Sequence, residues 1–259
     1  MARQEKHPDA PFRNFYGRRA GKTLRQVQKD DLESRLEPLT LKAVDWFENP
    51  ERKPVDPGAL FPDHKDLWLE IGFGGGEHLV AQAAAHRDVG FIGAEPFING
   101  VAMLLAKIKA SDVDNLMIHP GDVRDLFDVL PKASVGRAFL LYPDPWPKAR
   151  HHRRRFVTPE HLDPLAEVMK PGAILRIATD IEDYVRQTLW ELERHPAFDW
   201  QVTAPSDWRK PWDDWTSTRY EQKALREGRR PHYLTFQRRW FSFCQKYPRG
   251  VRGADSPPF

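Results

Sequence analysis

The chain of 259 residues contains a single cysteine, Cys244. One cysteine excludes an intramolecular disulfide framework and any zinc site built from several cysteines. A lone cysteine in an aromatic stretch, here residues 240–244, is more often a small packed hydrophobe than a nucleophile. We therefore interpret Cys244 as a packing residue.

Long apolar runs are also missing. No run approaches the ~18 residues that a membrane span requires, and the mean hydropathy is −0.66. Residues 1–11 carry charges but lack the apolar segment and the small-residue cleavage site of a secretory signal. The sequence therefore predicts a cytoplasmic protein without a membrane span.

Net charge is nearly balanced, with 40 Lys and Arg against 37 Asp and Glu. The charges are distributed unevenly, because residues 1–30, 148–155 and 209–239 together hold 22 basic and only 7 acidic side chains. Such asymmetry is typical of proteins that bind a polyanion. Three separate solvated faces would give the same composition.

Short apolar runs alternate with helical patterns from Leu67 onward. We expect strands at 67–71, 90–94, 116–119, 138–142 and 173–178, and helices at 77–85, 98–109, 159–169 and 181–194. This alternation predicts an α/β fold with a mostly parallel sheet and helices on both faces. Ligands of such sheets bind beyond the carboxyl ends of the strands, at the switch in strand order.

Both ends of the chain differ in composition from this central part. Residues 1–25 are rich in Arg, Lys, Gly and Pro, which predicts a basic, flexible arm. We expect a single domain over residues 26–245 and a flexible tail over 246–259. Apolar spacing between Lys29 and Phe47 predicts a further helix, broken near Pro38.

The first strand leads into a turn rich in glycine, which begins at Gly72. Such a turn lets the backbone approach a ligand closely. The dinucleotide fingerprint requires glycine at positions 1, 3 and 6 of the turn, and the sixth position here is Glu77. Glu70, just before the turn, would also repel a pyrophosphate. The pattern disfavours a nicotinamide dehydrogenase and favours a neutral or cationic ligand.

Acidic residues also follow the second and third strands. Glu95 lies 23 residues after Gly72, and an acid about 20 residues beyond such a turn commonly accepts hydrogen bonds from ribose hydroxyls. It could instead complement the dipole of the next helix. Asp122 could accept from an adenine amine or cap a helix. Acids at three successive strand ends together favour a ligand site.

The stretch after the fourth strand is the most specific in the chain. It reads Y-P-D-P-W-P-K over residues 142–148. Its three prolines predict an extended, rigid loop around Asp144, because each fixes its own φ and disfavours helix at the preceding residue. A basic run continues to Arg155 and would contact phosphates. Its two adjacent histidines, His151 and His152, lack the spacing of a metal pair.

This stretch closely resembles the tRNA (guanine-N7-)-methyltransferase family, which carries F-P-D-P-W-x-K at this place. The likeness extends to the segments E-I-G at 70–72, A-T-D at 178–180 and T-R-Y-E at 218–221. It implies a Rossmann-like class I methyltransferase fold, α/β with a mostly parallel seven-stranded sheet. It also implies S-adenosyl-L-methionine as methyl donor, tRNA as partner, no metal, and methylation of guanine N7 in the variable loop.

The resemblance also implies roles for individual residues. Asp144 would be catalytic. The cofactor would be bound by Glu70, Gly72, Glu95, Asp122 and Asp144. The RNA nucleoside would contact Lys148, Asp180, Thr218, Arg219, Tyr220 and Glu221. The family usually reads T-K-F-E-x-R-G where this chain reads T-R-Y-E-Q-K-A, so the contribution of the last two positions, Lys223 and Ala224, stays open.

Alternatives remain open from the sequence. The D-P-W segment at 144–146 loosely resembles the D/N-P-P-Y/F/W motif of methyltransferases that act on exocyclic amines, although the second proline is missing. A non-catalytic RNA-binding protein on a methyltransferase scaffold would be favoured by loss of the cofactor acids, and all are present. Trp208, Trp212 and Trp215 could stack on bases or pack in the core. The protein could be a monomer or a homodimer.

If the basic arm binds only RNA, deletion of residues 1–25 should weaken tRNA binding and leave the affinity for the cofactor unchanged.

Overall fold

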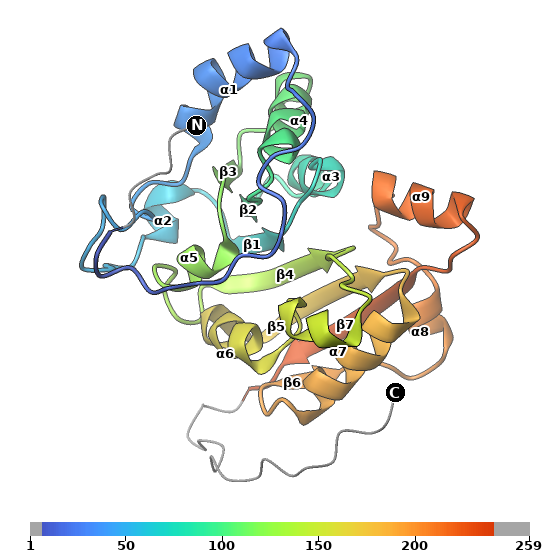
Figure 1. The fold of residues 1–259 in the computed structure, drawn as a ribbon. Coiled ribbons are helices and arrows are strands. Elements are labelled where there is room, and N and C mark those ends of the chain that lie inside the picture. Colours follow the sequence, from blue (N-terminus) through green and yellow to red (C-terminus); the bar gives the residue numbers. More distant parts are fainter. Residues whose placement is uncertain (1–6, 241–259) are drawn as a thin grey trace.

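The computed structural model describes residues 7–240. Within them the strands form one seven-stranded sheet of order β3-β2-β1-β4-β5-β7-β6 (Figure 1). The strands are β1 (Asp66–Ile71), β2 (Val89–Ala94), β3 (Leu116–His119), β4 (Val135–Leu141), β5 (Met169–Thr179), β6 (Phe198–Trp200) and β7 (His232–Arg238). The first five are mutually parallel, and β7 runs antiparallel to both β5 and β6. The predicted α/β fold is confirmed.

Helices cover both faces of this sheet (Figure 1). They are α1 (Gln26–Leu39), α2 (Pro57–Leu60), α3 (Glu77–Ala85), α4 (Ile98–Lys109), α5 (Val123–Phe127), α6 (Pro159–Val168), α7 (Glu182–Arg194), α8 (Ser206–Arg209) and α9 (Arg219–Arg226), with a 3-10 helix at Ala149–Arg154. Apolar residues of α3 and α4 pack on one face, and those of α5, α6 and α7 pack on the other. Both faces of the sheet are therefore shielded from water, as is usual for a parallel sheet.

The strand β1 shows how the sequence produces this arrangement. Leu67, Leu69 and Ile71 belong to the core on the α5–α7 side, while Trp68 belongs to the core on the α3–α4 side. Successive side chains alternate between the two faces. Because both faces are covered, the residues before Glu70, from Leu67 to Leu69, must be apolar. The sequence run is thus explained by burial on both sides.

The predicted elements are found with ends that differ by up to four residues. The exception is the helix expected between Lys29 and Phe47, which begins at Gln26 and ends at Leu39, directly after Pro38. The predicted break near Pro38 is confirmed, and the predicted helix beyond it is wrong, because residues 40–47 contain no helix. Thr40 instead forms a β-bridge with Ile118, because the chain turns there to place Leu41 and Val44 in the core.

Strand order reverses between β1 and β4. From β1 the chain moves outward through β2 to β3, and it then returns to β4 on the other side of β1. The connections leave these two strands toward opposite faces, which opens a crevice beyond their carboxyl ends. This crevice is where the sequence places its candidate site residues.

Residues 7–25 contain no helix or strand, and part of this segment lies against the domain. The amide of Ile98, the first residue of α4, donates to the carbonyl of Arg19 at 3.0 Å. The domain boundaries and the flexibility expected of residues 1–25 stay predictions. The expected tail at 246–259 and Cys244 lie outside the described residues. Among residues 7–240 there is no helix with the length and apolarity to cross a membrane.

The turn after β1 packs directly against α4. Gly72, Gly74 and Gly76 have φ values of 70°, 57° and 74°, a left-handed conformation that glycine adopts without steric cost. A Cβ atom placed on Gly100 of α4 would lie 2.2 Å from the carbonyl oxygen of Gly74. Glycine at position 100 therefore permits the close approach of helix and turn.

Replacing Gly100 with alanine should separate these two elements. We expect Gly100→Ala to lower the free energy of unfolding by about 1–3 kcal/mol, the usual cost of overpacking, as measured by urea denaturation. Gly58→Ala in α2 is the matched control, because its Cβ would meet only the Asp56 side chain, at 3.3 Å. Equal stability of the two variants would contradict the close contact.

Candidate active site

A cavity of about 1160 Å³ lies at the carboxyl ends of β1, β2 and β4. Four of the predicted cofactor residues are among those that line it: Gly72, Glu95, Asp122 and Asp144. They come from segments spread over more than 70 positions of sequence. The parallel sheet brings them together because all of its parallel strands end at this edge.

Glu95 is buried at the end of β2 and holds the glycine turn. One carboxylate oxygen accepts from the amide of Gly74 at 2.7 Å, and the other accepts from the amide of Phe97 at 2.9 Å. Burial raises the pKa of Glu95, against the opposing effect of these two amides. The side chain therefore links the turn after β1 to the start of α4.

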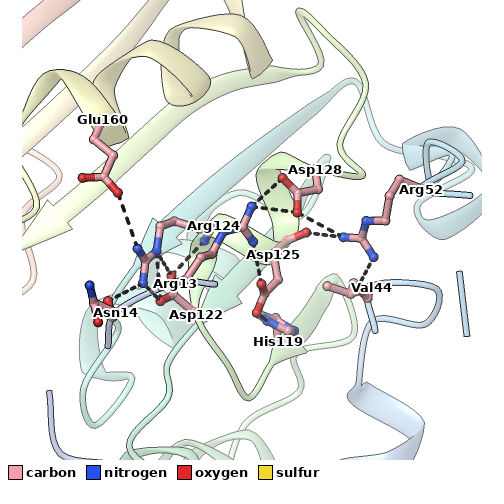
Figure 2. A network of polar contacts seen from close by, with 10 residues as sticks. All are labelled: Arg13, Asn14, Val44, Arg52, His119, Asp122, Arg124, Asp125, Asp128 and Glu160. Atoms are coloured by element: carbon pink, nitrogen blue, oxygen red, sulfur yellow. Dashed lines mark hydrogen bonds and ion pairs between the residues drawn. The ribbon is translucent and has the colours of Figure 1, made fainter. Parts of the chain in front are cut away.

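Asp122 is the N-cap of α5 and is also an ion-pair partner. Its Oδ1 accepts from the amide of Arg124 at 3.0 Å. The guanidinium of Arg124 also contacts both carboxylate oxygens, at 2.6 Å for Oδ2 and 3.0 Å for Oδ1 (Figure 2). The helix-capping interpretation is confirmed, and the contact with adenine stays a prediction.

Asp144 lies exposed on the loop after β4 and lines the cavity. Loss of hydration in the surrounding protein raises the pKa of its carboxyl, and Arg18 opposes this effect. Tyr142 and Trp146 flank it with φ values of 49° and 40°, a left-handed conformation that is rare outside glycine. The loop around Asp144 is thus held in an unusual backbone geometry.

Arg155 supports this loop from the protein interior. Only 1% of it is exposed, and its Nε donates to the carbonyl of Pro145 at 2.7 Å. It also donates to Gln187 at 2.9 Å and forms an ion pair with Asp183 of α7. We predicted that the basic run ending at Arg155 contacts phosphates, but this last arginine is directed at protein. The apolar residues that follow it are the only sequence signal of its burial.

Glu70 points to the α3–α4 face of the sheet and is not among the residues that line the cavity. Only 2% of it is exposed, and its Oε2 lies 2.7 Å from Nδ1 of His78 in α3. The imidazole is enclosed by Phe139 and Trp215. In this geometry Glu70 connects β1 to α3 beneath the glycine turn, and its contact with a cofactor stays a prediction.

Two residues of the T-R-Y-E segment hold its backbone in place. Thr218 caps α9, because its hydroxyl accepts from the amide of Glu221 at 3.2 Å. Glu221 is 4% exposed and accepts from the indole of Trp215 at 2.9 Å and from the hydroxyl of Tyr233. Both side chains thus bind protein groups in this structure.

The other two residues of the segment lie over the glycine turn. Tyr220 is 43% exposed and lines the cavity, and its ring would be 2.9 Å from a Cβ placed on Gly74. The guanidinium of Arg219 contacts the sulfur of Met103 in α4 at 2.8 Å. The start of α9 therefore covers the turn that follows β1.

Asp180 and Lys148 complete the predicted set, and neither is among the residues that line the cavity. Asp180, at the end of β5, forms an ion pair with Arg229 beyond α9. Lys148 is exposed just before the 3-10 helix, which carries the exposed Arg150 and Arg153. Arg153 also lines the cavity. Positive charge thus borders the cavity on the side of Asp144.

The tryptophans that the sequence left unassigned contribute mainly to packing. Trp212 and Trp215 pack against the core on the α3–α4 side, and the indole of Trp212 donates to Thr235 at 2.9 Å. Trp208 stacks on His232 at 5.4 Å between ring centroids. In the described part of the chain, no group of three or more His, Cys, Asp or Glu side chains is arranged to hold a metal ion.

Comparisons with known proteins agree with this geometry. Residues 64–234 match a family model described as "Putative methyltransferase". The chain is 67% identical over 231 residues to a tRNA (guanine-N(7)-)-methyltransferase of Ruegeria pomeroyi, covering 89% of this chain and 97% of that protein. It is also 67% identical over 228 residues to the enzyme of the same name from Roseobacter denitrificans, covering 88% of this chain and 97% of that protein.

Among solved structures, the 16S rRNA methyltransferase KamB superposes with a TM-score of 0.49 at 18% identity, over 72% of this chain and 95% of that one. The relatives of high identity match over nearly their whole length. The chain therefore belongs to the tRNA (guanine-N(7)-)-methyltransferase family.

Proposed function

We propose that this protein transfers a methyl group from S-adenosyl-L-methionine to N7 of a guanine in tRNA, in the cytoplasm. The observation that carries the proposal is the position of Asp144. Its rigid loop faces the same cavity as the glycine turn and Glu95. The names of the relatives, which match at up to 67% identity, support tRNA as the substrate.

The cavity fits this cofactor in size and in chemistry. Its volume of about 1160 Å³ exceeds the ~300–1,000 Å³ typical of small-molecule sites, so it has room for a ligand that contains a nucleoside. A Cβ placed on Gly72 would meet nothing within 4 Å, so the turn leaves open space above its backbone. The carboxylates of Glu95, Asp122 and Asp144 line the cavity and would accept hydrogen bonds from the hydroxyls and the amine of this cofactor.

Individual residues would hold different parts of the cofactor. Glu95 has lone pairs left after accepting two amides and would accept from the ribose hydroxyls. Asp122 would accept from the adenine amine while Arg124 keeps its carboxylate oriented. Asp144 would lie near the sulfur. When bound, S-adenosylmethionine supplies a methyl group activated by a sulfonium.

The chemistry at guanine requires alignment more than proton transfer. N7 carries a lone pair and no proton, and it faces the major groove in a stacked base. A general base is therefore unnecessary, and the protein contributes proximity and electrostatic stabilisation. Asp144 would accept from guanine N1–H and N2–H, or favour the positive charge that develops on the purine.

Basic residues at the rim would bind the RNA backbone. Lys148, Arg150 and Arg153 are exposed beside the cavity and would bring phosphates close to the target base. Such contacts release counterions, so the affinity falls as salt rises. An enzyme acting on an exocyclic amine could use the same surface, and only the identity of the product separates these two functions.

Identification of the methylated nucleoside tests the proposal directly. The purified protein is incubated with unmodified tRNA and labelled S-adenosylmethionine, and the digested RNA is analysed by chromatography and mass spectrometry. We expect N7-methylguanosine. We also expect Asp144→Asn to reduce the turnover number at least ~100-fold, the usual effect of removing an electrostatic contact in an active site.

The control is Asp63→Asn, an exposed aspartate before β1, at the opposite edge of the sheet. Its activity should match that of the unmodified protein. Methylation of an exocyclic amine would support the rival enzyme. Full activity of Asp144→Asn would exclude Asp144 from the reaction.

Tyr220 and Glu221 of the T-R-Y-E segment should respond differently to substitution. Tyr220→Ala removes a side chain that lines the cavity, so methyl transfer should fall while the melting temperature stays within about 2 °C. Glu221→Ala leaves the indole of Trp215 and the hydroxyl of Tyr233 without their buried acceptor, which costs about 1–3 kcal/mol. Thermal denaturation and steady-state kinetics measure both effects, and an unchanged melting temperature of Glu221→Ala would contradict its structural role.

Neutralising the basic residues beside the cavity should weaken RNA binding, because it removes contacts with phosphates. For the triple variant of Lys148, Arg150 and Arg153 to alanine, the slope of log affinity against log salt should become less steep by about 0.7–0.9 per lost phosphate contact, as measured by filter binding. The matched control replaces Lys65, Arg87 and Lys132, which are exposed before β1, β2 and β4 at the opposite edge. If the control variant shows the same change in slope, RNA binding depends on the overall charge of the protein and not on these three residues.

A further inference from the structure

The N-terminal segment forms one wall of the cavity. Six of its residues are among those that line it: Phe12, Asn14, Phe15, Tyr16, Gly17 and Arg18. The segment passes across the molecule between α5 and α4 (dark blue in Figure 1). It therefore borders the cavity together with the glycine turn and the Asp144 loop, although it precedes the first strand by about 50 residues.

Ion pairs on α5 hold the beginning of this wall. Arg13 contacts Asp125 at 2.7 Å, and its other terminal nitrogen contacts both oxygens of Asp128 at 2.7 and 2.8 Å (Figure 2). Only 22% of the Arg13 side chain is exposed. Burial lowers the pKa of Arg13, but the two carboxylates outweigh this effect and raise it overall. These forked, charge-assisted bonds are the strong kind.

Arg124 joins the wall to a predicted cofactor residue. Its NH2 group donates to the carbonyl of Asn14 at 2.9 Å and to Asp122 at 2.6 Å (Figure 2). One guanidinium thus holds both the N-terminal segment and the carboxylate assigned to adenine. A displacement of the segment would leave that arginine with one partner fewer.

Hydrogen bonds at the start of α4 hold the other end. The carbonyl of Arg19 accepts from the amide of Ile98 at 3.0 Å, which satisfies a helix N-terminal donor that lacks an intrahelical partner. Asn99 accepts from the amide of Gly21 at 2.7 Å and donates to the carbonyl of Lys22 at 2.7 Å. The segment is therefore fixed on both sides of the cavity.

The middle of the segment contacts the Asp144 loop. The ring of Tyr16 meets that of Trp146 edge to face, with centroids 6.3 Å apart. The guanidinium of Arg154 lies over both rings, at 4.7 Å from the centroid of Tyr16 and 5.0 Å from that of Trp146. The wall is thus in contact with the loop that carries the catalytic candidate.

We propose that residues 12–22 form a strap that is part of the cofactor site, with Arg13 as the positioning residue that holds it closed. The strap limits the exchange of S-adenosylmethionine and of its demethylated product. This inference rests on the proposed cofactor site. It differs from an arm that serves RNA alone, because it predicts a change in cofactor affinity without any RNA present.

The test measures cofactor binding to the full chain in the absence of RNA. Calorimetry gives the dissociation constants of S-adenosylmethionine and S-adenosylhomocysteine, and stopped-flow fluorescence gives the dissociation rate. We expect Arg13→Ala to raise both dissociation constants about tenfold, with a faster dissociation rate. Arg13→Lys keeps the charge but loses the fork, so its effect should lie between those of the alanine variant and the original.

Two controls separate this role from a general loss of structure. Arg87→Ala breaks an exposed ion pair with Asp114 at 3.4 Å, and its dissociation constants should stay within about twofold. Steady-state kinetics with tRNA should show Arg13→Ala with a raised KM for the cofactor and a retained kcat at saturation. A purely structural defect would lower kcat and the melting temperature of the cofactor-free protein as well.

The outcomes decide between the strap and the alternatives. If the original protein binds the cofactor and Arg13→Ala binds it with equal affinity and dissociation rate, the strap is overturned and the proposed function stands. If the original protein binds neither compound, the proposed cofactor site and the strap are both overturned. If Arg13→Ala loses kcat with an unchanged KM, Arg13 is not a positioning residue for the cofactor.

Discussion

Carboxylates gathered at one edge of a parallel sheet repel one another, and much of this structure offsets that repulsion. Glu95 is stabilised by the amides of Gly74 and Phe97, and Asp122 by the guanidinium of Arg124. Asp180 is paired with Arg229 beyond α9. Among these acids of the carboxyl edge, Asp144 is the one that lies exposed in the cavity with a raised pKa. A cationic ligand placed there would be attracted without having to displace an existing ion pair.

The same arrangement explains which parts could be predicted from sequence. Strand ends follow from apolar runs and from the acids and glycines that terminate them, so the α/β fold and the convergence of Gly72, Glu95, Asp122 and Asp144 followed from the sequence pattern. A sequence pattern gives the type of a group but not its partner. Whether Asp122 caps a helix, binds Arg124 or faces a ligand depends on contacts between elements distant in the chain.

Three residues show this limit clearly. Glu70 pairs with His78 on the α3–α4 face of the sheet, Arg155 lies in the interior beneath the proline-rich loop, and Glu221 accepts from Trp215 and Tyr233. Each belongs to a motif that also contains residues lining the cavity. Local sequence cannot distinguish a residue that contacts a ligand from the neighbour that holds it, because both are polar and both occur at the same strand end.

The left-handed backbone of Tyr142 and Trp146 has a consequence for how this enzyme could be made more stable. Each such residue costs of order 1 kcal/mol relative to a relaxed conformation, and the buried Arg155 and the surrounding contacts keep the loop in that state. Stability and preorganisation are therefore opposed at this loop, as they often are at functional sites. Substitutions that relax the backbone of this loop would be selected in a screen for heat resistance. The same substitutions would be lost in a screen for turnover.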